Sequence, residues 1–334
     1  MTARNTYTAR QIGLSIVGLL VALAWLLVMP THTNAAYEIE KLPEDTVVGD
    51  FVVGPGKVEL SVQPGETKTV ELLVTNRMGT ARTFNLAIED VTGSQDPNTT
   101  VVLLGDDRGP YSLHDYLQIP EMSFVLQHAE RARVPVTISV PADAEPGGRY
   151  GTVLVTTTSA EDGSAVEPGM ARTGSVIVSR VGTLFFVTVP GNVRTEGALE
   201  SFSTIPDKMF FTDGPIRFQV LFGNTGSIHL NPYGEIRIRN IFGQEVGVVR
   251  ADPWFALPGS LRFRELAWDR GYLGGYYTAE LTLNRGYQDI LDTATVSFVV
   301  VPWKLIAIVF TAIFALIFAI RFIARRFEIR VKTK

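Results

Sequence analysis

The sequence predicts an all-β external part made of two tandem immunoglobulin-like β-sandwiches, between an N-terminal signal or anchor helix and one C-terminal transmembrane helix. Three observations predict this class. Apolar and polar residues alternate through much of residues 51–302, Pro-Gly and Asp-Gly turns separate these runs at short intervals, and both ends of the chain are apolar. An alternation of period two is typical of strands with one buried face and one wet face, and short strands separated by such turns are typical of sandwiches.

The C-terminal apolar segment, residues 303–323, is long enough to cross a membrane. As a helix its 21 residues rise about 31 Å, close to the thickness of the hydrocarbon core of a bilayer. The tail that follows, residues 324–334, is basic, and basic flanks remain in the cytoplasm. We therefore expect a single-pass protein of the plasma membrane, with a cytoplasmic C-terminus and the bulk of the chain extracellular. The residues expected to anchor the helix at the two interfaces are Trp303, Lys304, Arg321, Arg325 and Arg326.

The N-terminal segment, residues 1–35, has the order of a secretory signal. Two arginines and no acid precede an apolar run, Ile12–Met29, which is followed by Pro30 and then by small residues up to Ala35. Cleavage is expected after Ala35. The apolar run is longer than usual in a signal peptide, so an uncleaved anchor stays open as an alternative.

The external part is acidic and has no cysteine. Residues 37–302 carry 21 basic and 33 acidic side chains, a net charge of −12. This charge argues against nucleic acid, and against an anionic wall polymer held by electrostatics. Without disulfides, an exported chain must be held together by its apolar cores. The absence of cysteine from an exported chain also favours a bacterial origin. Residues 36–50 are polar and are expected to form a linker.

Two similar units follow the linker. The first sandwich is expected at residues 51–191, with an insertion near 92–120, and the second at residues 198–302, directly before the membrane helix. Each unit has an Asn at the end of a strand and, further on, a Gly-Gly pair followed within two residues by a Tyr. We expect the Asn to bond the backbone of its own turn, and the Tyr to cap the core with its hydroxyl at the rim. These residues are Asn76 and Tyr150 in the first unit and Asn224 and Tyr277 in the second.

The sequence shows no arrangement typical of catalysis or of metal binding. The four histidines are isolated from one another and there is no cysteine to join them, so neither a metal site nor a nucleophile with its base is predicted. Pairs of acidic residues lie beside Gly or Arg in turns, where solvated side chains are ordinary. We predict that the protein is not an enzyme and carries no metal or cofactor.

The insertion is the predicted ligand-binding surface. Its second half places Tyr111, His114 and Tyr116 among acidic residues and Arg108, and aromatics among polar groups suit a glycan or a protein epitope. The alternative is a loop that packs on its own sandwich. A second apolar feature, Trp254-Phe255, is interpreted either as core or as an anchor at the membrane interface.

Several stretches together carry a family resemblance. Val62–Thr67 contains Pro-Gly-Glu-Thr before a strand that ends in Asn76, and Val134–Val140 leads through Pro141 to Pro146–Gly151. With the single span and basic tail, residues 50–190 resemble the bacterial WxL-interacting cell-surface proteins, whose first sandwich is described as a peptidoglycan-binding domain. The resemblance implies peptidoglycan as a partner and assigns no binding residue.

The leading hypothesis is therefore a membrane-anchored bacterial cell-surface protein that presents two immunoglobulin-like domains to cell wall (peptidoglycan) or to a surface protein partner. The alternative is a structural stalk or subunit of a surface assembly without a small ligand, held by lateral contacts through edge strands. A wall-polymer hydrolase is the weakest of the three hypotheses because no base is paired with a nucleophile. The sequence leaves the identity of the ligand and the oligomeric state open.

Overall fold

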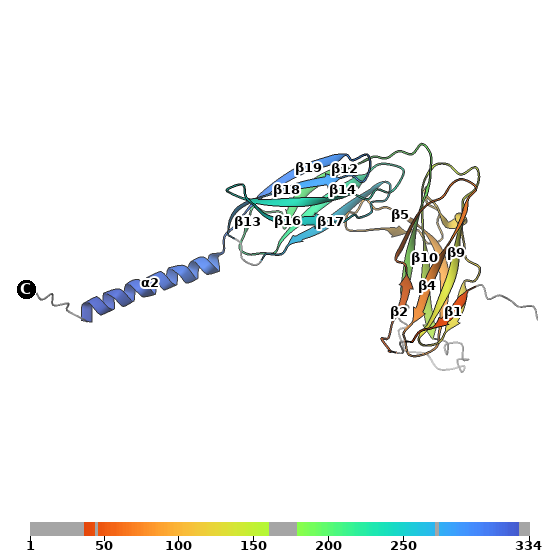
Figure 1. Cartoon of the computed structure of the whole chain (residues 1–334), viewed down its shortest axis with the longest axis horizontal. Coiled ribbons are helices and arrows are strands. Elements are labelled where there is room, and N and C mark those ends of the chain that lie inside the picture. Colours follow the sequence, from red (N-terminus) through yellow and green to blue (C-terminus); the bar gives the residue numbers. More distant parts are fainter. Residues whose placement is uncertain (1–36, 44–45, 160–178, 271–273, 327–334) are drawn as a thin grey trace, which may run out of the picture.

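The computed structural model describes residues 37–43, 46–159, 179–270 and 274–326. Figure 1 shows two β-domains set at a steep angle to each other, and a helix that leaves the far end of the second domain. This helix is α2, Trp303–Arg326. The expected signal or anchor segment and the last eight residues of the basic tail lie outside the described residues.

The first domain is a sandwich of two sheets. Its elements are β1 (Glu38–Lys41), β2 (Phe51–Gly54), β3 (Lys57–Ser61), β4 (Thr67–Asn76), β5 (Arg82–Thr92), β6 (Val102–Leu103), the 3-10 helix η1 (His114–Tyr116), β7 (Leu117–Gln118), β8 (Ser123–Leu126), β9 (Glu130–Ser139), β10 (Gly147–Ser159) and β11 (Arg180–Val189). One sheet has the order β2-β4-β9, with β1 and β7 on the outer edge of β9. The other has the order β3-β11-β10-β5, with β6 and β8 on β5.

The second domain repeats this architecture. Its strands are β12 (Gly197–Ile205), β13 (Phe210–Phe211), β14 (Ile216–Asn224), β15 (Tyr233–Asn240), β16 (Glu245–Ala251), β17 (Ser260–Trp268), β18 (Gly275–Asn284) and β19 (Leu291–Val300). One sheet has the order β12-β14-β17 and the other the order β13-β19-β18-β15-β16.

The alternation in the sequence explains where the two cores lie. In β9 every second residue is fully buried between the sheets, as are the alternate residues of β14. The residues are Ala132, Val134, Val136 and Ile138 in β9, and Ile216, Phe218, Val220 and Phe222 in β14. The prediction of mainly β structure with one C-terminal apolar helix is confirmed.

In each domain two consecutive strands near the start lie in opposite sheets. In the first domain β2 pairs with β4, and β3 then crosses over to pair in parallel with the last strand, β11. In the second domain β12 pairs with β14, and β13 crosses over to pair in parallel with the last strand, β19. A cis peptide bond precedes Pro55 in the first crossing and Pro206 in the second. The two domains therefore share one strand topology.

The predicted role of the two asparagines is confirmed by their matching contacts. The amide of Asn76 donates to the carbonyls of Thr80 and Leu126, both at 2.9 Å, and its oxygen accepts from the Met78 N–H. In the second domain, the amide of Asn224 donates to two carbonyls and its oxygen accepts from the N–H two residues on. Each side chain thus holds its own turn and ties it to a distant segment.

The two tyrosines do not have equivalent positions, which corrects half of that prediction. Tyr277 packs in the second core, and its hydroxyl donates to the Gly274 carbonyl at 3.2 Å. Tyr150 is fully buried but lies on the opposite face of its sheet from Val153 and Val155, which line the first core. Because side chains alternate between the faces of a strand, a register difference of one residue is enough to turn Tyr150 away from its own core.

The expected linker also needs a correction, because part of residues 36–50 is strand β1. Glu38–Lys41 pairs antiparallel with β9, and the Glu40 carboxylate bonds the guanidinium groups of Arg131 and Arg133 at 3.1 and 2.6 Å. An edge strand held by ion pairs buries little apolar surface. Its sequence therefore lacks the alternation by which strands are recognised.

We predict that Asn76→Ala and Asn224→Ala each lower the free energy of unfolding by about 2–3 kcal/mol, because each leaves one buried carbonyl, one half-buried carbonyl and one N–H without their partner. Chemical denaturation of residues 37–302, which contain both cores, measures the loss. Asn192→Ala is the control, since Asn192 is exposed in the connection between the domains. Equal stability of the three variants would contradict the prediction.

Candidate functional site

The insertion does not gather the three predicted ligand-binding residues into one surface. The Tyr111 ring packs edge-on against Tyr150 between the domains, whereas Tyr116 packs against the first core. The His114 ring lies outside, with its Nδ1 2.8 Å from an Arg108 nitrogen and 3.0 Å from the Asp115 carboxylate. The contacts of both tyrosines match the alternative of a loop packed on its own protein, and a binding role for the three residues stays a prediction.

A buried carboxylate holds this part of the insertion in place. Asp90, at the end of β5, is fully buried, and its Oδ1 accepts hydrogen bonds from the backbone N–H groups of Leu113 and His114 at 3.0 and 2.9 Å. Leu113 itself is fully buried in the first core. The insertion is thus anchored at its centre by one polar and one apolar contact.

The first half of the insertion, residues 93–101, here called the strap, binds the second domain. Its carbonyls accept from the outward N–H groups of β17: Ser94 from Leu261 at 2.9 Å and Pro97 from Phe263 at 3.2 Å. Arg262 donates to the Thr100 carbonyl at 2.9 Å. A side chain at Gly93 would collide with Ser260. The strap therefore covers the edge of β17 as an additional strand would.

A polar contact between Glu59 of the first domain and His229 and Asn231 of the second, here called the elbow, also joins the domains. The His229 ring donates from Nε2 to the Glu59 carboxylate at 2.7 Å, and Asn231 donates to the same oxygen at 3.1 Å. The Tyr150 hydroxyl accepts from the His229 N–H at 2.5 Å and lies 3.3 Å from Nδ1. The His229 hydrogen bond, followed by the interactions with Lys57, lowers the pKa of Glu59 to about 2 against the opposing effect of desolvation.

Aromatic packing surrounds this polar contact. Phe186, on the outer face of the first domain, meets Phe255 of the second domain edge-on, with ring centroids 4.9 Å apart. Lys57 lies over both rings, and Arg262 lies over Phe255. Trp254 is instead part of the second core. The apolar feature Trp254-Phe255 therefore belongs partly to the core and partly to the elbow, at the opposite end of the domain from α2.

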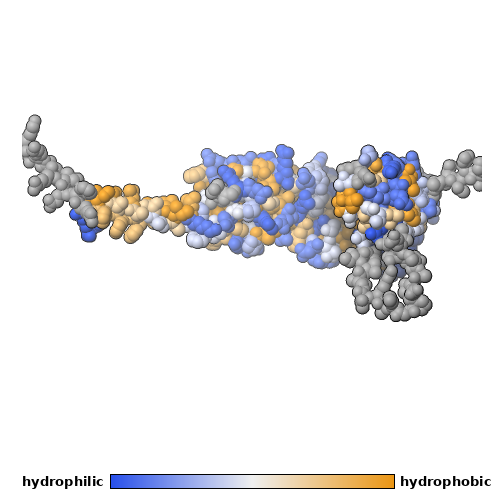
Figure 2. All heavy atoms as spheres, turned by 90° about the horizontal axis from the view of Figure 1, so that it is seen from below, coloured by the Kyte–Doolittle hydropathy of each residue, from blue (hydrophilic) through white to orange (hydrophobic). Residues whose placement is uncertain are grey.

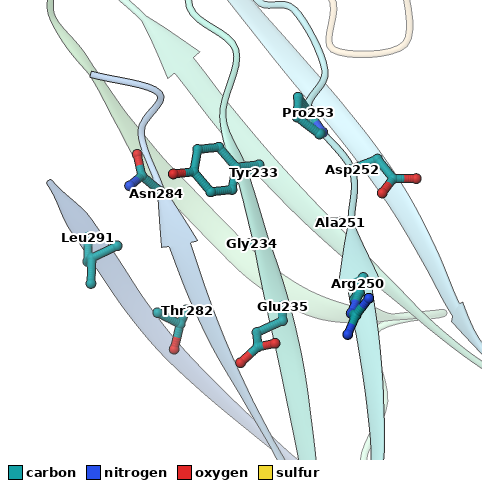
Figure 3. A pocket seen from close by; sticks show the side chains of 10 residues that line it. All are labelled: Tyr233, Gly234, Glu235, Arg250, Ala251, Asp252, Pro253, Thr282, Asn284 and Leu291. Carbon is teal, nitrogen blue, oxygen red and sulfur yellow. The ribbon is translucent and has the colours of Figure 1, made fainter. Parts of the chain in front are cut away.

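An open depression of about 470 Å³ lies on the outer sheet of the second domain. Its residues come from β15, β16, β18 and β19 and from the segment just after β16, and Figure 3 shows the Tyr233 ring turned toward Asn284. It lies at the end of the domain nearest the elbow. The lining residues are Tyr233, Gly234, Glu235, Arg250, Ala251, Asp252, Pro253, Thr282, Asn284 and Leu291.

Several polar groups of the depression are available to a ligand. Within the described part of the chain, the Arg250 guanidinium, the Asp252 carboxylate and the Tyr233 hydroxyl have no hydrogen-bond or ion-pair partner. Tyr233 is 44% exposed, so the ring offers an apolar face beside these groups. Glu235 is already held by Arg237, with a nitrogen–oxygen distance of 2.6 Å. An aromatic face beside free donors and acceptors is the usual arrangement of a site for a mixed polar and apolar ligand.

The sequence contained a signal for Tyr233 that the predictions did not use. Tyr233 starts a run in which Ile236 and Ile238 face the core and Glu235, Arg237 and Arg239 alternate with them. The same alternation that predicts the strand therefore places Tyr233 on its wet face. The rest of the lining comes from strands up to 58 residues away in the sequence, which alternation alone does not bring together.

One edge of the same sheet is open beside the depression. Val299 and Val301 donate their N–H groups to the carbonyls of Met209, just before β13, and of Phe211 in β13. The N–H groups of Thr293, Thr295 and Ser297 therefore point to the same side of β19. Strand β13 pairs only with Val299 and Val300, and no other described strand pairs with this side. These three N–H groups are therefore available to an added strand.

The described part of α2 is long and apolar enough to cross a bilayer, and none of its apolar window is buried against protein. Trp303 and Lys304 lie in its first turn, Arg321 lies near its end, and Arg325 and Arg326 are its last two residues. Their role as anchors stays a prediction. Among the residues that the structure describes, no group of three or more His, Cys, Asp or Glu side chains is placed to hold a metal ion.

No family model matches the sequence, and no curated protein matches it. Among solved structures, the chain is similar to the class 5 fimbriae chaperone CfaA, with 10% identity, a TM-score of 0.35, and coverage of 75% of this chain and 99% of that one. The chaperone CupB2 of Pseudomonas aeruginosa is 11% identical, with a TM-score of 0.33 and coverage of 75% of this chain and 100% of that one. A PapD-like domain of human CEP192 is 13% identical, with a TM-score of 0.30 and coverage of 49% of this chain and 99% of that one. Likenesses at this level say nothing about what this chain binds, and none of them bears on the resemblance to WxL-interacting proteins.

The elbow gives a prediction for the dependence of stability on pH. The pKa of Glu59 is lowered to about 2 in the folded chain, so its contribution to stability is present above the ordinary pKa of a glutamate and is lost as pH falls from about 4.5 toward 2. We expect Glu59→Gln to lower the free energy of unfolding at pH 7 by an amount on the order of 1 kcal/mol, because Glu59 is partly exposed to water. The difference should shrink at pH 3. Denaturation at both pH values measures it, with the exposed Glu200→Gln as control, and a difference unchanged at pH 3 would contradict the prediction.

Proposed function

We propose that the chain is a membrane-anchored cell-surface binding protein whose ligand is a segment of cell-wall polymer, peptidoglycan in the first place. The observation that carries the proposal is the depression on the second domain, where the exposed Tyr233 ring lies beside unpaired polar groups. The resemblance of residues 50–190 to WxL-interacting proteins supports the same class of ligand.

The chemistry of the depression favours a ligand of sugars and peptide. The Tyr233 ring can stack on the apolar face of a sugar, while Arg250 and Asp252 can bond its hydroxyl, amide or carboxylate groups. The two free charges are opposite in sign, which suits a ligand of mixed charge better than a polyanion. The net charge of −12 on residues 37–302 also disfavours a polyanion, because like charges repel.

In this proposal α2 spans the plasma membrane, with the basic tail in the cytoplasm and both domains outside. The depression lies where β15 and β19 begin and β18 ends, which is the end of the second domain away from α2 and from the bilayer. The role is binding without catalysis. The lining contains no Ser or His, and its hydroxyl groups, Tyr233 and Thr282, make no hydrogen bond to any carboxylate that the structure describes and that could act as their base.

We predict that Tyr233→Ala weakens binding of residues 37–302 to purified peptidoglycan about tenfold, the usual effect of removing a central aromatic contact. Co-sedimentation at physiological salt measures the affinity. Tyr276→Ala is the control, since Tyr276 is a partly exposed tyrosine on the same sheet at its other end. Saturable binding that is equal in both variants would place the site elsewhere, and no binding by the folded fragment would set peptidoglycan aside.

A second candidate function is favoured by the open edge of β19. The chain can serve as a subunit of a surface assembly, in which an extended segment of a second copy or of another surface protein adds a strand beside Thr293, Thr295 and Ser297.

A pair of proline variants tests this edge. Thr295→Pro removes an outward N–H and should leave the stability of residues 37–302 nearly unchanged, whereas Ala294→Pro removes a bond to β18 and should cost about 3 kcal/mol. If the edge carries assembly, self-association measured by analytical ultracentrifugation should be lost in Thr295→Pro and kept in Thr295→Ala. A fragment that stays monomeric at all concentrations would argue against assembly between copies of this chain.

A further inference from the structure

The end of the second domain next to α2 carries large apolar side chains that no core uses. Phe242 is 83% exposed, Ile241 68% and Phe210 64%. In Figure 2 hydrophobic residues lie at this end of the domain, beside the start of the helix. We call this set the membrane rim: Met209, Phe210, Ile241, Phe242, Tyr276 and Val301.

Strand pairing places the rim level with the start of the helix. Phe210 is paired with Val299, four residues before Trp303. Across the sheet Asn240 is paired with Tyr277, and Gly275 with Val300, so the turn that follows Asn240 ends near the level of Val300. At about 3.3 Å per residue, the tip of the hairpin lies about 10 Å and Phe210 about 13 Å from the first residue of α2 along the strand direction. The headgroup layer on one side of a bilayer is about 5–8 Å thick, so the backbone of both sites lies just outside this layer where α2 enters, and the exposed side chains are the groups that can extend into it.

The turn that exposes Phe242 is firmly built. The Asn240 side chain accepts from the N–H groups of Phe242 and Gln244, both at 3.0 Å, and donates to the Gln244 side chain. Gly243 has a φ of +75°, which a residue with a side chain rarely adopts. Two adjacent apolar side chains are thus held outward at the tip of a rigid hairpin. Exposed apolar side chains in such a setting mark a contact surface.

The sheet order separates the two apolar sites on either side of the helix. In the order β13-β19-β18-β15-β16, β13 carries Phe210 on one edge and the hairpin of β15 and β16 carries Phe242 on the other, while α2 continues from β19 between them. With neighbouring strands about 4.8 Å apart, the three to four strand spacings between the sites amount to about 14–19 Å. Contacts on both sides of the helix would prevent the domain from tilting about the short connection at Val301 and Pro302.

We propose that the membrane rim is set into the headgroup layer of the bilayer that α2 crosses, and that it fixes the orientation of the external part against the membrane. The inference rests on the proposed function, because it takes α2 as the membrane span. Both signs of charge flank the rim, with Lys208 and Arg270 close to Asp207 and Asp269. Insertion therefore depends on the apolar side chains and does not require anionic lipid.

The absence of cysteine makes a direct test straightforward. The full chain is reconstituted at one copy per nanodisc of phosphatidylcholine, with a single environment-sensitive nitrobenzoxadiazole label at Phe242→Cys or Phe210→Cys. Leu291→Cys, exposed at the opposite end of the same domain, is the matched control, and Phe314→Cys reports on the middle of α2. Nitroxide-labelled lipids are then added to the nanodiscs as quenchers.

At positions 242 and 210 we expect the emission of the label to be blue-shifted and most of it to be quenched by nitroxides on the lipid headgroups. At position 291 we expect no quenching. Quenching at position 314 by nitroxides on the lipid tails, with no quenching at 242 or 210, would contradict the insertion of the membrane rim and would still support α2 as the membrane span. Absence of quenching at all four positions would instead overturn the span itself. A blue shift at 242 without lipid quenching would show that protein covers the side chain, which also overturns the proposal.

Discussion

The contact of His229 with Glu59 and Tyr150 is the constraint on which the external part depends. A chain without cysteine has no disulfide between its domains, and here three residues from the two domains hydrogen-bond one another, with Tyr150 and His229 buried and Glu59 partly exposed. The aromatic cluster around Phe186 packs beside this contact, and the strap joins the domains through the backbone of β17. The two joins are continuous, because Arg262 lies over Phe255 and also donates to the Thr100 carbonyl of the strap. Rotation of one domain against the other would therefore have to disrupt polar, aromatic and backbone contacts together.

Much of the fold was accessible from the sequence because each core is built from strands of period two. The alternation in β9 and β14 identifies buried residues directly, and the Asn before a turn has a role that local chemistry defines. Strand β1 was missed because ion pairs of Glu40, and no apolar face, hold it on the sheet. The orientation of Tyr150 was missed because a register difference of one residue exchanges the two faces of a strand.

The candidate site was less accessible for a different reason. The composition of the insertion predicts a ligand-binding surface. Aromatic residues among polar ones are equally suited to packing between domains, which is where Tyr111 lies. The depression around Tyr233 is assembled from β15, β16, β18 and β19, and its free groups become visible only when the ion pairs of the neighbouring residues are known. Which polar side chains are left without partners is a property of the folded surface.

The direct passage of β19 into α2 has a mechanical consequence. If the wall pulls on the distal end of the second domain while the membrane holds α2, the tension runs along the axis of β19. This strand is paired with β18 over its full length, from Leu291 to Val300. Tension parallel to a strand loads all of its hydrogen bonds together, whereas tension across a strand opens them one at a time. The chain is therefore attached to its anchor in the geometry that best resists being pulled out of shape.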